Sequence, residues 1–173
     1  MSPVKRTPVS GGGPADRDRE AYDVVIVGGG AIGVALACAL ADGLAPAGRI
    51  ALVDPLVSNA APAEPDARAS AVSAGSKRLL DVLGAWRTLA PHAEPVTAVD
   101  ITDSALGDAF RPILVSYDNT VERGEPATYI VENERLRAAL LEALAGRSGI
   151  ALIAGTAEAW HAAEGGGAIV LAD

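Results

Sequence analysis

The sequence is poor in the residues that build disulfide frameworks, metal clusters and aromatic cores. Its 173 residues include one Cys, two His and 3% aromatic residues. A single cysteine excludes an intramolecular disulfide framework and a cysteine-based zinc cluster, and it fits the reducing cytoplasm. The histidines, His92 and His161, lie far apart and match no metal-ligand spacing. We therefore expect no metal site, and a core packed from Ala, Val and Leu.

Basic residues are also scarce. The chain has 14 Lys and Arg against 22 Asp and Glu, which gives a formal net charge of -8. A nucleic-acid binder needs a basic face to neutralise phosphates, so this balance argues against nucleic-acid binding. Charged residues make up 21% of the chain and hydrophobic residues 50%, a composition that excludes a disordered chain. The length fits one domain, or one domain with a piece of another.

The sequence also lacks the apolar segments that target or anchor a chain. A secretory signal needs an apolar region of about 7–15 residues, and none precedes Tyr22. Residues 1–20 are instead rich in Pro, Gly, Ser and alternating charge, and we expect a disordered leader there. Residues 24–41 carry no charge, but each glycine of the run at 28–30 would cost about 1 kcal/mol inside a helix. A strand, a turn and a helix therefore fit this stretch better than a membrane span.

What the sequence does contain is a glycine-rich turn between a strand and a helix. Residues 23–27 form a short apolar run, typical of a strand buried on both faces. The letters GGGAIG at residues 28–33 follow, as a G-x-G-x-x-G motif, and an apolar helix is expected over residues 31–44. A second apolar run at residues 50–53 ends in Asp54. The whole unit has about 30 residues, the size of a βαβ unit.

Each part of this unit has a role in binding a dinucleotide. Gly28 permits the tight turn, Gly30 lets the backbone approach a pyrophosphate, and Gly33 lets the helix pack against the sheet. The start of the helix, at Ala31 and Ile32, presents N–H groups and a partial positive charge to phosphates. The alternative reading is a glycine-rich turn that holds no ligand.

Asp54 supports the interpretation of this unit as a dinucleotide-binding site. It lies about 20 residues after the glycines, at the carboxyl end of the second strand. There a carboxylate can accept hydrogen bonds from both ribose hydroxyls, and it would repel the extra phosphate of an NADP-type ribose. Cys38 lies on the apolar helix and is interpreted as small core packing.

The rest of the chain predicts alternating strands and helices, so the fold class is α/β. After a loop over 55–67, a helix is expected over 77–83, ended by Gly84 and with Trp86 packing against its end. Strands are expected over 96–103, 112–117 and 128–131, with a loop over 118–125. A helix over 134–145 with Asn133 as its N-cap, a strand over 150–153 and a hairpin over 157–163 and 168–171 complete the chain. The strand, helix and strand of residues 128–153 suggest a further parallel crossover onto the same sheet.

Two segments resemble a known family. The first is DARASAVSAGS at residues 66–76, followed by Leu residues and then Trp86; the second is VENERL at residues 131–136. On these residues the chain resembles the amino-terminal portion of the flavin-dependent aromatic hydroxylases, the group A flavoprotein monooxygenases. The closest resemblance is to the ubiquinone-biosynthesis hydroxylases, which act on polyprenylated phenols. The resemblance runs from about residue 22 to residue 173.

The resemblance implies a fold and a domain layout. It implies a Rossmann-like FAD-binding domain with a parallel sheet, the start of a β-meander and part of the substrate-domain sheet. Residues 21–173 would be the amino-terminal portion of the FAD-binding domain, and strands within 96–130 would contribute to the substrate-side sheet. The later Asp-Gly and Gly-Asp motifs of the family are not in the sequence, so we expect a truncated portion of such an enzyme.

The resemblance also implies roles for individual residues. The motif glycines would bind the ADP part of FAD, and Asp54 would hold the adenosine ribose, where many relatives have Glu. Arg68 would reach the pyrophosphate and flavin region, a site that suits a planar, permanently charged fork. Asn133 would lie near the ribityl chain. Arg68 could instead be a solvated loop residue, and Asn133 could serve as a helix cap, alone or together with the ribityl role.

The implied activity is hydroxylation of an aromatic ring with O₂, with FAD as cofactor and NADPH or NADH as reductant. A polyprenylated phenol substrate would imply ubiquinone biosynthesis, in a cytoplasmic location with peripheral contact to the inner membrane or to a biosynthetic complex. Because the flavin supplies the difficult chemistry, no catalytic acid or base is expected. Two alternatives stay open: an NAD-dependent dehydrogenase, which leaves residues 66–86 unexplained, and an inactive truncated nucleotide-binding domain.

Overall fold

The predicted βαβ unit forms where the sequence places it. The computed structural model describes residues 20–44, 47–57, 67–105, 107–163 and 165–172. Strand β1 (Val24–Val27), helix α1 (Ala31–Leu44) and strand β2 (Ile50–Val53) follow one another, and α1 and β2 have the predicted bounds. β1 and β2 are parallel, with Val24 opposite Ile50. β2 is buried along its whole length, which explains its continuous run of apolar residues.

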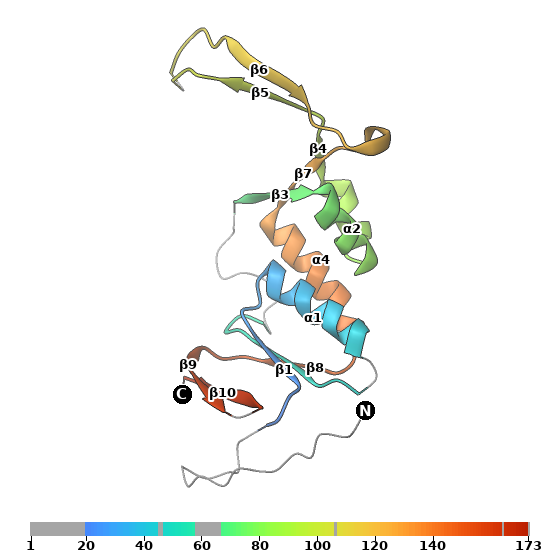
Figure 1. Cartoon of the computed structure of the whole chain (residues 1–173), viewed down its shortest axis with the longest axis vertical. Helices are drawn as coiled ribbons and strands as arrows, with labels where there is room; N and C mark the ends of the chain where they lie inside the picture. The colour runs from blue at the N-terminus through green and yellow to red at the C-terminus, as the bar shows by residue number, and fades with distance from the viewer. Residues whose placement is uncertain (1–19, 45–46, 58–66, 106, 164, 173) are drawn as a thin grey trace.

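A third strand completes the parallel sheet. β8 (Ile150–Ile153) pairs in parallel with β2, so the strand order is β1-β2-β8. Helices α1 and α4 (Asn133–Ala145) lie on one side of this sheet, and the hairpin of β9 (Ala157–Ala163) and β10 (Gly166–Leu171) lies on the other in the view of Figure 1. The predicted strand at 150–153 and the predicted hairpin are confirmed. The fold class is α/β with a Rossmann-type parallel unit.

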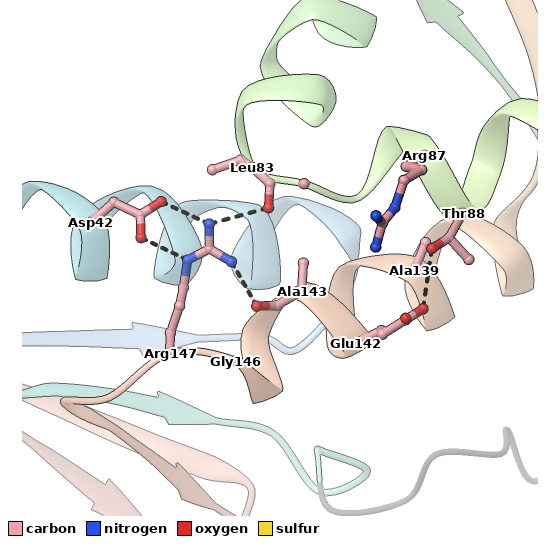
Figure 2. A pocket seen from close by; sticks show the side chains of 10 residues that line it. Asp42, Leu83, Arg87, Thr88, Ala139, Glu142, Ala143, Gly146 and Arg147 are labelled. Atoms are coloured by element: carbon pink, nitrogen blue, oxygen red, sulfur yellow. Dashed lines mark hydrogen bonds and ion pairs between the residues drawn. The ribbon is translucent and has the colours of Figure 1, made fainter.

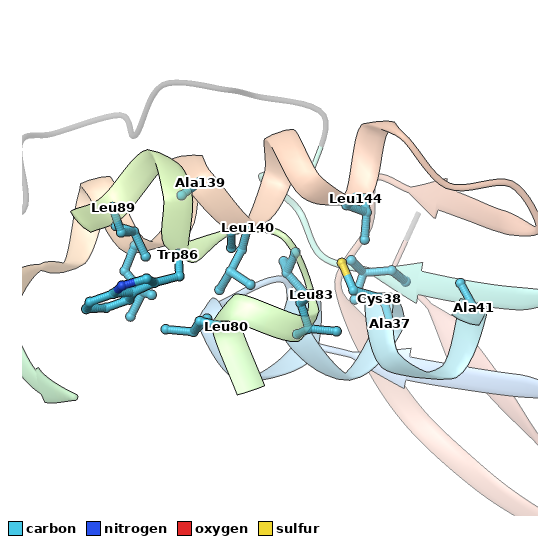
Figure 3. Close-up of a cluster of buried hydrophobic side chains, with 14 of the residues drawn as sticks. Ala37, Cys38, Ala41, Leu80, Leu83, Trp86, Leu89, Ala139, Leu140 and Leu144 are labelled. Carbon is cyan, nitrogen blue, oxygen red and sulfur yellow. The ribbon is translucent and has the colours of Figure 1, made fainter. Parts of the chain in front are cut away.

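The main core lies between the helices and the sheet (Figure 3). Val34 and Cys38 of α1 are fully buried, and Leu140 of α4 is 1% exposed. Cys38 therefore packs in the core, as predicted. Burial is the main cause that raises the pKa of its thiol, which keeps the sulfur in its neutral, unreactive form at neutral pH.

A second, antiparallel sheet corrects two predictions. It consists of β3 (Ala69–Ser73), β7 (Thr128–Glu132) and β4 (Glu94–Val96), in the order β3-β7-β4. β3 was not predicted, because its Ala and Ser residues have little β-propensity and its strand conformation depends on pairing with β7. The predicted crossover is also wrong in part: β8 joins the parallel sheet, but β7, on the other side of α4, belongs to the antiparallel one.

The helix after β3 starts earlier than predicted. α2 (Ala74–Val82) begins with Ser73 as its N-cap, whose Oγ accepts a hydrogen bond of 3.1 Å from the Ser76 N–H. Its end follows the prediction: Gly84 has a φ of 81° and donates to the Asp81 carbonyl, while the next N–H donates to the Leu80 carbonyl. These two bonds form a Schellman motif, which needs a residue in the left-handed region.

Trp86 packs against the end of this helix, as predicted. It opens the short helix α3 (Trp86–Leu89), which the 3-10 turn η1 (Ala90–His92) follows. Trp86 is 8% exposed, and its ring meets that of Tyr129 edge to face, with centroids 5.2 Å apart. This contact joins α3 to the antiparallel sheet.

A two-stranded ribbon projects from the far end of the molecule (Figure 1). It pairs β5 (Ala98–Thr102) with β6 (Ile113–Asp118), and the 3-10 turn η2 (Glu122–Gly124) follows in the predicted loop. The predicted strand at 96–103 is therefore two strands, β4 and β5, which break at Thr97 and enter different sheets. The predicted leader, apart from Glu20, and most of the predicted loop at 55–67 lie outside the described residues. Within the described part of the chain, no helix is both long enough and apolar enough to span a membrane.

Candidate nucleotide-binding site

The glycine turn lies at the carboxyl edge of the parallel sheet. Because β1 and β2 run in the same direction, their ends meet there, and the Gly28 N–H donates to the Val53 carbonyl at 2.8 Å. Gly28 has a φ of 106°, a value that L side chains rarely adopt. The helical bonding of α1 begins at once, since the Val34 N–H donates to the Gly30 carbonyl at 3.0 Å. The first N–H groups of α1, including those of Ala31 and Ile32, have no acceptor inside the helix and face this edge.

The glycines of the motif lie in different surroundings. A Cβ at Gly33 would lie 1.9 Å from the Gly28 carbonyl oxygen, so the helix can approach the strand only without a side chain there. A Cβ at Gly30 would have nothing within 4 Å, and its φ is not positive. No contact within the described part of the protein therefore explains a glycine at position 30, and the open space beside it can admit a ligand.

Asp54 lies directly against the glycine turn. Its Oδ2 accepts a hydrogen bond of 2.7 Å from the Gly29 N–H, and its Oδ1 accepts one of 2.7 Å from the Leu56 N–H. A Cβ at Gly29 would lie 2.9 Å from the Asp54 Cβ. Gly29 was not among the predicted site residues, although its place as the middle glycine of three was a signal.

This arrangement fits the ribose and phosphate part of a dinucleotide. Each carboxylate oxygen can accept a second hydrogen bond, so Asp54 keeps acceptor capacity for ribose hydroxyls while the backbone fixes its orientation. The N-terminus of α1 adds N–H donors and a partial positive charge, which suit a pyrophosphate. The open space at Gly30 comes directly before the first residue of α1 and directly after Gly29, whose N–H holds Asp54.

The antiparallel sheet brings Arg68 and Asn133 together. Ala69 pairs with Glu132 in the β3–β7 ladder, and the Asn133 N–H donates to the Arg68 carbonyl at 3.0 Å. The Arg68 side chain is exposed. The Asn133 Oδ1 accepts a hydrogen bond of 2.6 Å from the Ser70 Oγ.

The predicted N-cap role of Asn133 is wrong. The helix begins at Asn133 itself, and Glu132 holds the cap position without a side-chain cap bond. The reason is tertiary: the Asn133 side chain is bonded across to β3 rather than to its own helix.

A hydrogen bond connects helix α4, which begins at Asn133, with the segment that follows Asp54. The Arg137 Nη2 donates to the Leu56 carbonyl at 2.9 Å, two residues after Asp54. Arg137 lies four residues after Asn133, and side chains at that spacing are neighbours on one face of a helix. Neither Arg137 nor Ser70 was among the predicted site residues. The spacing of 133 and 137 was a signal for Arg137, whereas Ser70 had none.

A pocket among the helices lies away from the glycine turn. It has a volume of about 410 Å³ and lies between α1, α2, α3 and α4 (Figure 2). Asp42 lines it, about 16 Å along α1 from Ala31 at 1.5 Å per residue. Arg147 donates to both Asp42 carboxylate oxygens and to the Ala143 and Leu83 carbonyls, at 2.6 to 3.1 Å. This guanidinium joins three helices, which is a structural role.

Side chains with catalytic or metal-binding chemistry are dispersed over the described residues. Within those residues, no three His, Cys, Asp or Glu side chains gather to hold a metal ion. His92 and His161 are both exposed, on η1 and β9.

Known proteins resemble this chain in sequence. No protein-family model matches the chain. The chain is 37% identical over 122 residues to ubiquinone hydroxylase UbiL of Rhodospirillum rubrum, a match that covers 70% of this chain and 27% of that protein. It is 34% identical over 138 residues to the mitochondrial ubiquinone biosynthesis monooxygenase COQ6 of Danio rerio, covering 73% of this chain and 26% of the relative. The chain thus spans about a quarter of the length of these relatives.

Solved structures share the fold. PqsL, a probable FAD-dependent monooxygenase from Pseudomonas aeruginosa, matches with a TM-score of 0.62 and 20% identity over 86% of this chain and 36% of its own. The flavin-dependent monooxygenase PieE, in complex with FAD and substrate, matches with a TM-score of 0.64 and 18% identity over 87% of this chain and 26% of its own. These structures show the shared fold, and the sequence relatives show that the chain belongs to the FAD-dependent monooxygenase family and corresponds to the amino-terminal part of its members.

Proposed function

We propose that this chain is the FAD-binding portion of an NAD(P)H- and O₂-dependent hydroxylase of aromatic rings. The observation that carries the proposal is the position of Asp54. Its carboxylate is fixed by the Gly29 N–H at 2.7 Å, beside the N-terminus of α1 and the open space at Gly30. A ribose acceptor, a phosphate-binding helix end and room for a pyrophosphate meet at one edge of the sheet, as in dinucleotide-binding folds.

In this proposal each residue binds or orients part of the cofactor. The backbone at Gly28, Gly30 and Gly33 and the N–H groups of Ala31 and Ile32 hold the pyrophosphate, and the Asp54 carboxylate accepts from the ribose hydroxyls of the adenosine. Two further residues contact the cofactor: Arg68 supplies positive charge toward the pyrophosphate and flavin, and Asn133 contacts the ribityl chain. When bound, the flavin supplies the redox and oxygen chemistry. The chain's own residues bind it and fix its position.

The substrate class and setting are part of the same proposal. Ubiquinone hydroxylase UbiL and the COQ6 monooxygenase are named for ubiquinone and its biosynthesis, which supports a polyprenylated phenol as substrate. NADPH or NADH would be the reductant, and the enzyme would work in the cytoplasm, at the periphery of the inner membrane or in a biosynthetic complex. We assign residues 21–173 to the FAD-binding domain and the strands within 96–130 to the substrate side. Full activity belongs to a polypeptide of the relatives' length.

The test is a titration of the purified chain with FAD, followed by quenching of flavin fluorescence. The informative variant is Gly30→Ala, because its Cβ would meet nothing within 4 Å of the protein but would enter the space of a pyrophosphate. Hydrogen bonds to charged groups contribute about 1.5–3 kcal/mol each, so we expect affinity for FAD to fall about 10- to 100-fold. The matched control is Gly43→Ala in the last turn of α1, where a Cβ also meets nothing within 4 Å.

The outcomes separate the proposed function from its alternatives. Gly30→Ala and Gly43→Ala should both keep the thermal stability of the wild-type chain, and only Gly30→Ala should bind FAD weakly. Binding of NADH without binding of FAD would indicate an NAD-dependent oxidoreductase instead. Binding of neither would indicate an inactive truncated domain.

A further inference from the structure

The Asn133 side chain is held by a residue 63 positions earlier in the sequence. Ser70 of β3 places its Oγ 2.6 Å from the Asn133 Oδ1, in a part-buried pair. The strand register explains the contact, because Ser70 lies opposite Val131, two residues before Asn133. We propose that Ser70 is a positioning residue, which turns the Asn133 carboxamide toward the flavin half of FAD. This inference rests on the proposed function.

The direction of the hydrogen bond shows which way the amide points. The Ser70 hydroxyl donates to the Asn133 Oδ1 at 2.6 Å, a length within the range of O–H···O bonds, about 2.5–3.0 Å. The amide oxygen is therefore the acceptor that faces Ser70. Because the two polar atoms of a carboxamide point to different sides, Nδ2 is turned away from Ser70.

The backbone fixes the same residue a second time. The Asn133 N–H donates to the Arg68 carbonyl at 3.0 Å, so main chain and side chain of Asn133 are both bonded to the segment 68–70. The side chain is not used as a helix cap, since Glu132 holds that position. Asn133 is thus pre-oriented at the start of α4, and a ligand that meets its amide need not order that side chain on binding.

The chemistry of an amide suits a chain of hydroxyl groups. Its nitrogen has two donors and its oxygen is an acceptor, and the Ser70 hydroxyl occupies one lone pair of that oxygen. The orientation of the amide is then fixed from the Ser70 side. Without the serine hydroxyl, the amide can rotate about its last torsion and present oxygen or nitrogen to the ligand. Ser70 would therefore act on FAD through Asn133 and not by contact.

The experiment measures affinities for FAD and for ADP, the latter by competition with FAD. ADP carries the adenosine and pyrophosphate part of the cofactor without the flavin and its ribityl chain. The variants are Ser70→Ala, Ser70→Thr, Asn133→Ala and the double variant Ser70→Ala with Asn133→Ala. The matched control is Ser116→Ala, which removes a serine bond of the same 2.6 Å length to Asp100 on the β5–β6 ribbon.

We expect Ser70→Ala to weaken FAD binding about fivefold, the equivalent of one neutral hydrogen bond, and to leave ADP binding unchanged. Ser70→Thr keeps the hydroxyl and should bind FAD within about twofold of the wild type. The double variant should bind FAD no more weakly than Asn133→Ala alone, because residues that act through one another are not additive.

Four results would overturn the inference. The first is a Ser70→Ala variant that binds FAD as well as Ser116→Ala does. The second is full additivity in the double variant, and the third is an equal loss of ADP binding in Ser70→Ala. The fourth is a wild-type chain that does not bind FAD at all, which would remove the proposed function as well, whereas the other three leave that function intact.

Discussion

Replacement of Gly33 by Ala tests how closely α1 must approach β1. A Cβ at this position would lie 1.9 Å from the Gly28 carbonyl oxygen and 3.1 Å from its carbonyl carbon. Contacts under 3.0 Å are essentially absent for real Cβ atoms, so the helix and the strand would have to separate by at least the difference between 3.0 and 1.9, or 1.1 Å. The two Gly28 atoms that the Cβ would meet belong to the backbone, so they cannot rotate away as a side chain could.

The loss of unfolding free energy depends on how tightly the residues that follow Gly33 in α1 are packed. Val34, Ala37 and Cys38 are all 0% exposed, so a shift of the helix start disturbs tightly packed residues. Inserting atoms into a packed core costs about 1–3 kcal/mol and occasionally more, and a clash with backbone belongs at the upper end. We expect Gly33→Ala to lose about 3 kcal/mol of unfolding free energy, a large share of the about 5–15 kcal/mol of a typical domain.

The assay is urea unfolding, followed by far-UV circular dichroism and by Trp fluorescence. Gly43→Ala in the same helix is the control, and it should unfold at the wild-type midpoint or slightly above it, because Ala is favoured over Gly in helices by about 1 kcal/mol. The reasoning fails if Gly33→Ala unfolds at the same urea concentration as Gly43→Ala. The close approach of α1 to β1 would then not need a glycine.

Two further predictions concern the ion pairs. Hydrogen bonds from Lys77 and then Arg78 lower the pKa of Glu125, so its contribution to stability is fully present above its ordinary pKa and is lost as the pH falls through the lowered one. The difference in melting temperature between the wild type and Glu125→Gln should therefore be largest near neutral pH and disappear only once the pH has fallen below the lowered pKa, and a difference that does not change with pH would contradict this. Arg147→Met removes hydrogen bonds to Asp42 and to two backbone carbonyls. Because Asp42 is half exposed, we expect this change to lower the unfolding free energy by only about 2 kcal/mol, measured by urea unfolding. Arg87→Met in the same pocket should leave the unfolding free energy unchanged.

The sequence by itself predicted the elements whose signals are local. The bounds of α1 and β2 follow from a run of apolar residues, a glycine turn and an acid at the end of the second strand. Gly84 ends α2 because a Schellman motif needs the left-handed conformation that glycine adopts without strain. Signals of this kind involve residues a few positions apart, so they can be read without knowing the fold.

The tertiary structure decided the rest, because the partners are far apart in sequence. β3 is a strand only because it pairs with β7, and the break at Thr97 occurs because β4 and β5 enter different sheets. Asn133 looked like a helix cap, but a serine 63 residues earlier takes its side chain. The sequence placed a glycine turn and an acid at one edge of a sheet; only the folded chain revealed that Gly29 fixes Asp54. A local motif can be recognised from neighbouring residues, whereas the partner of a strand or side chain that is distant in sequence cannot.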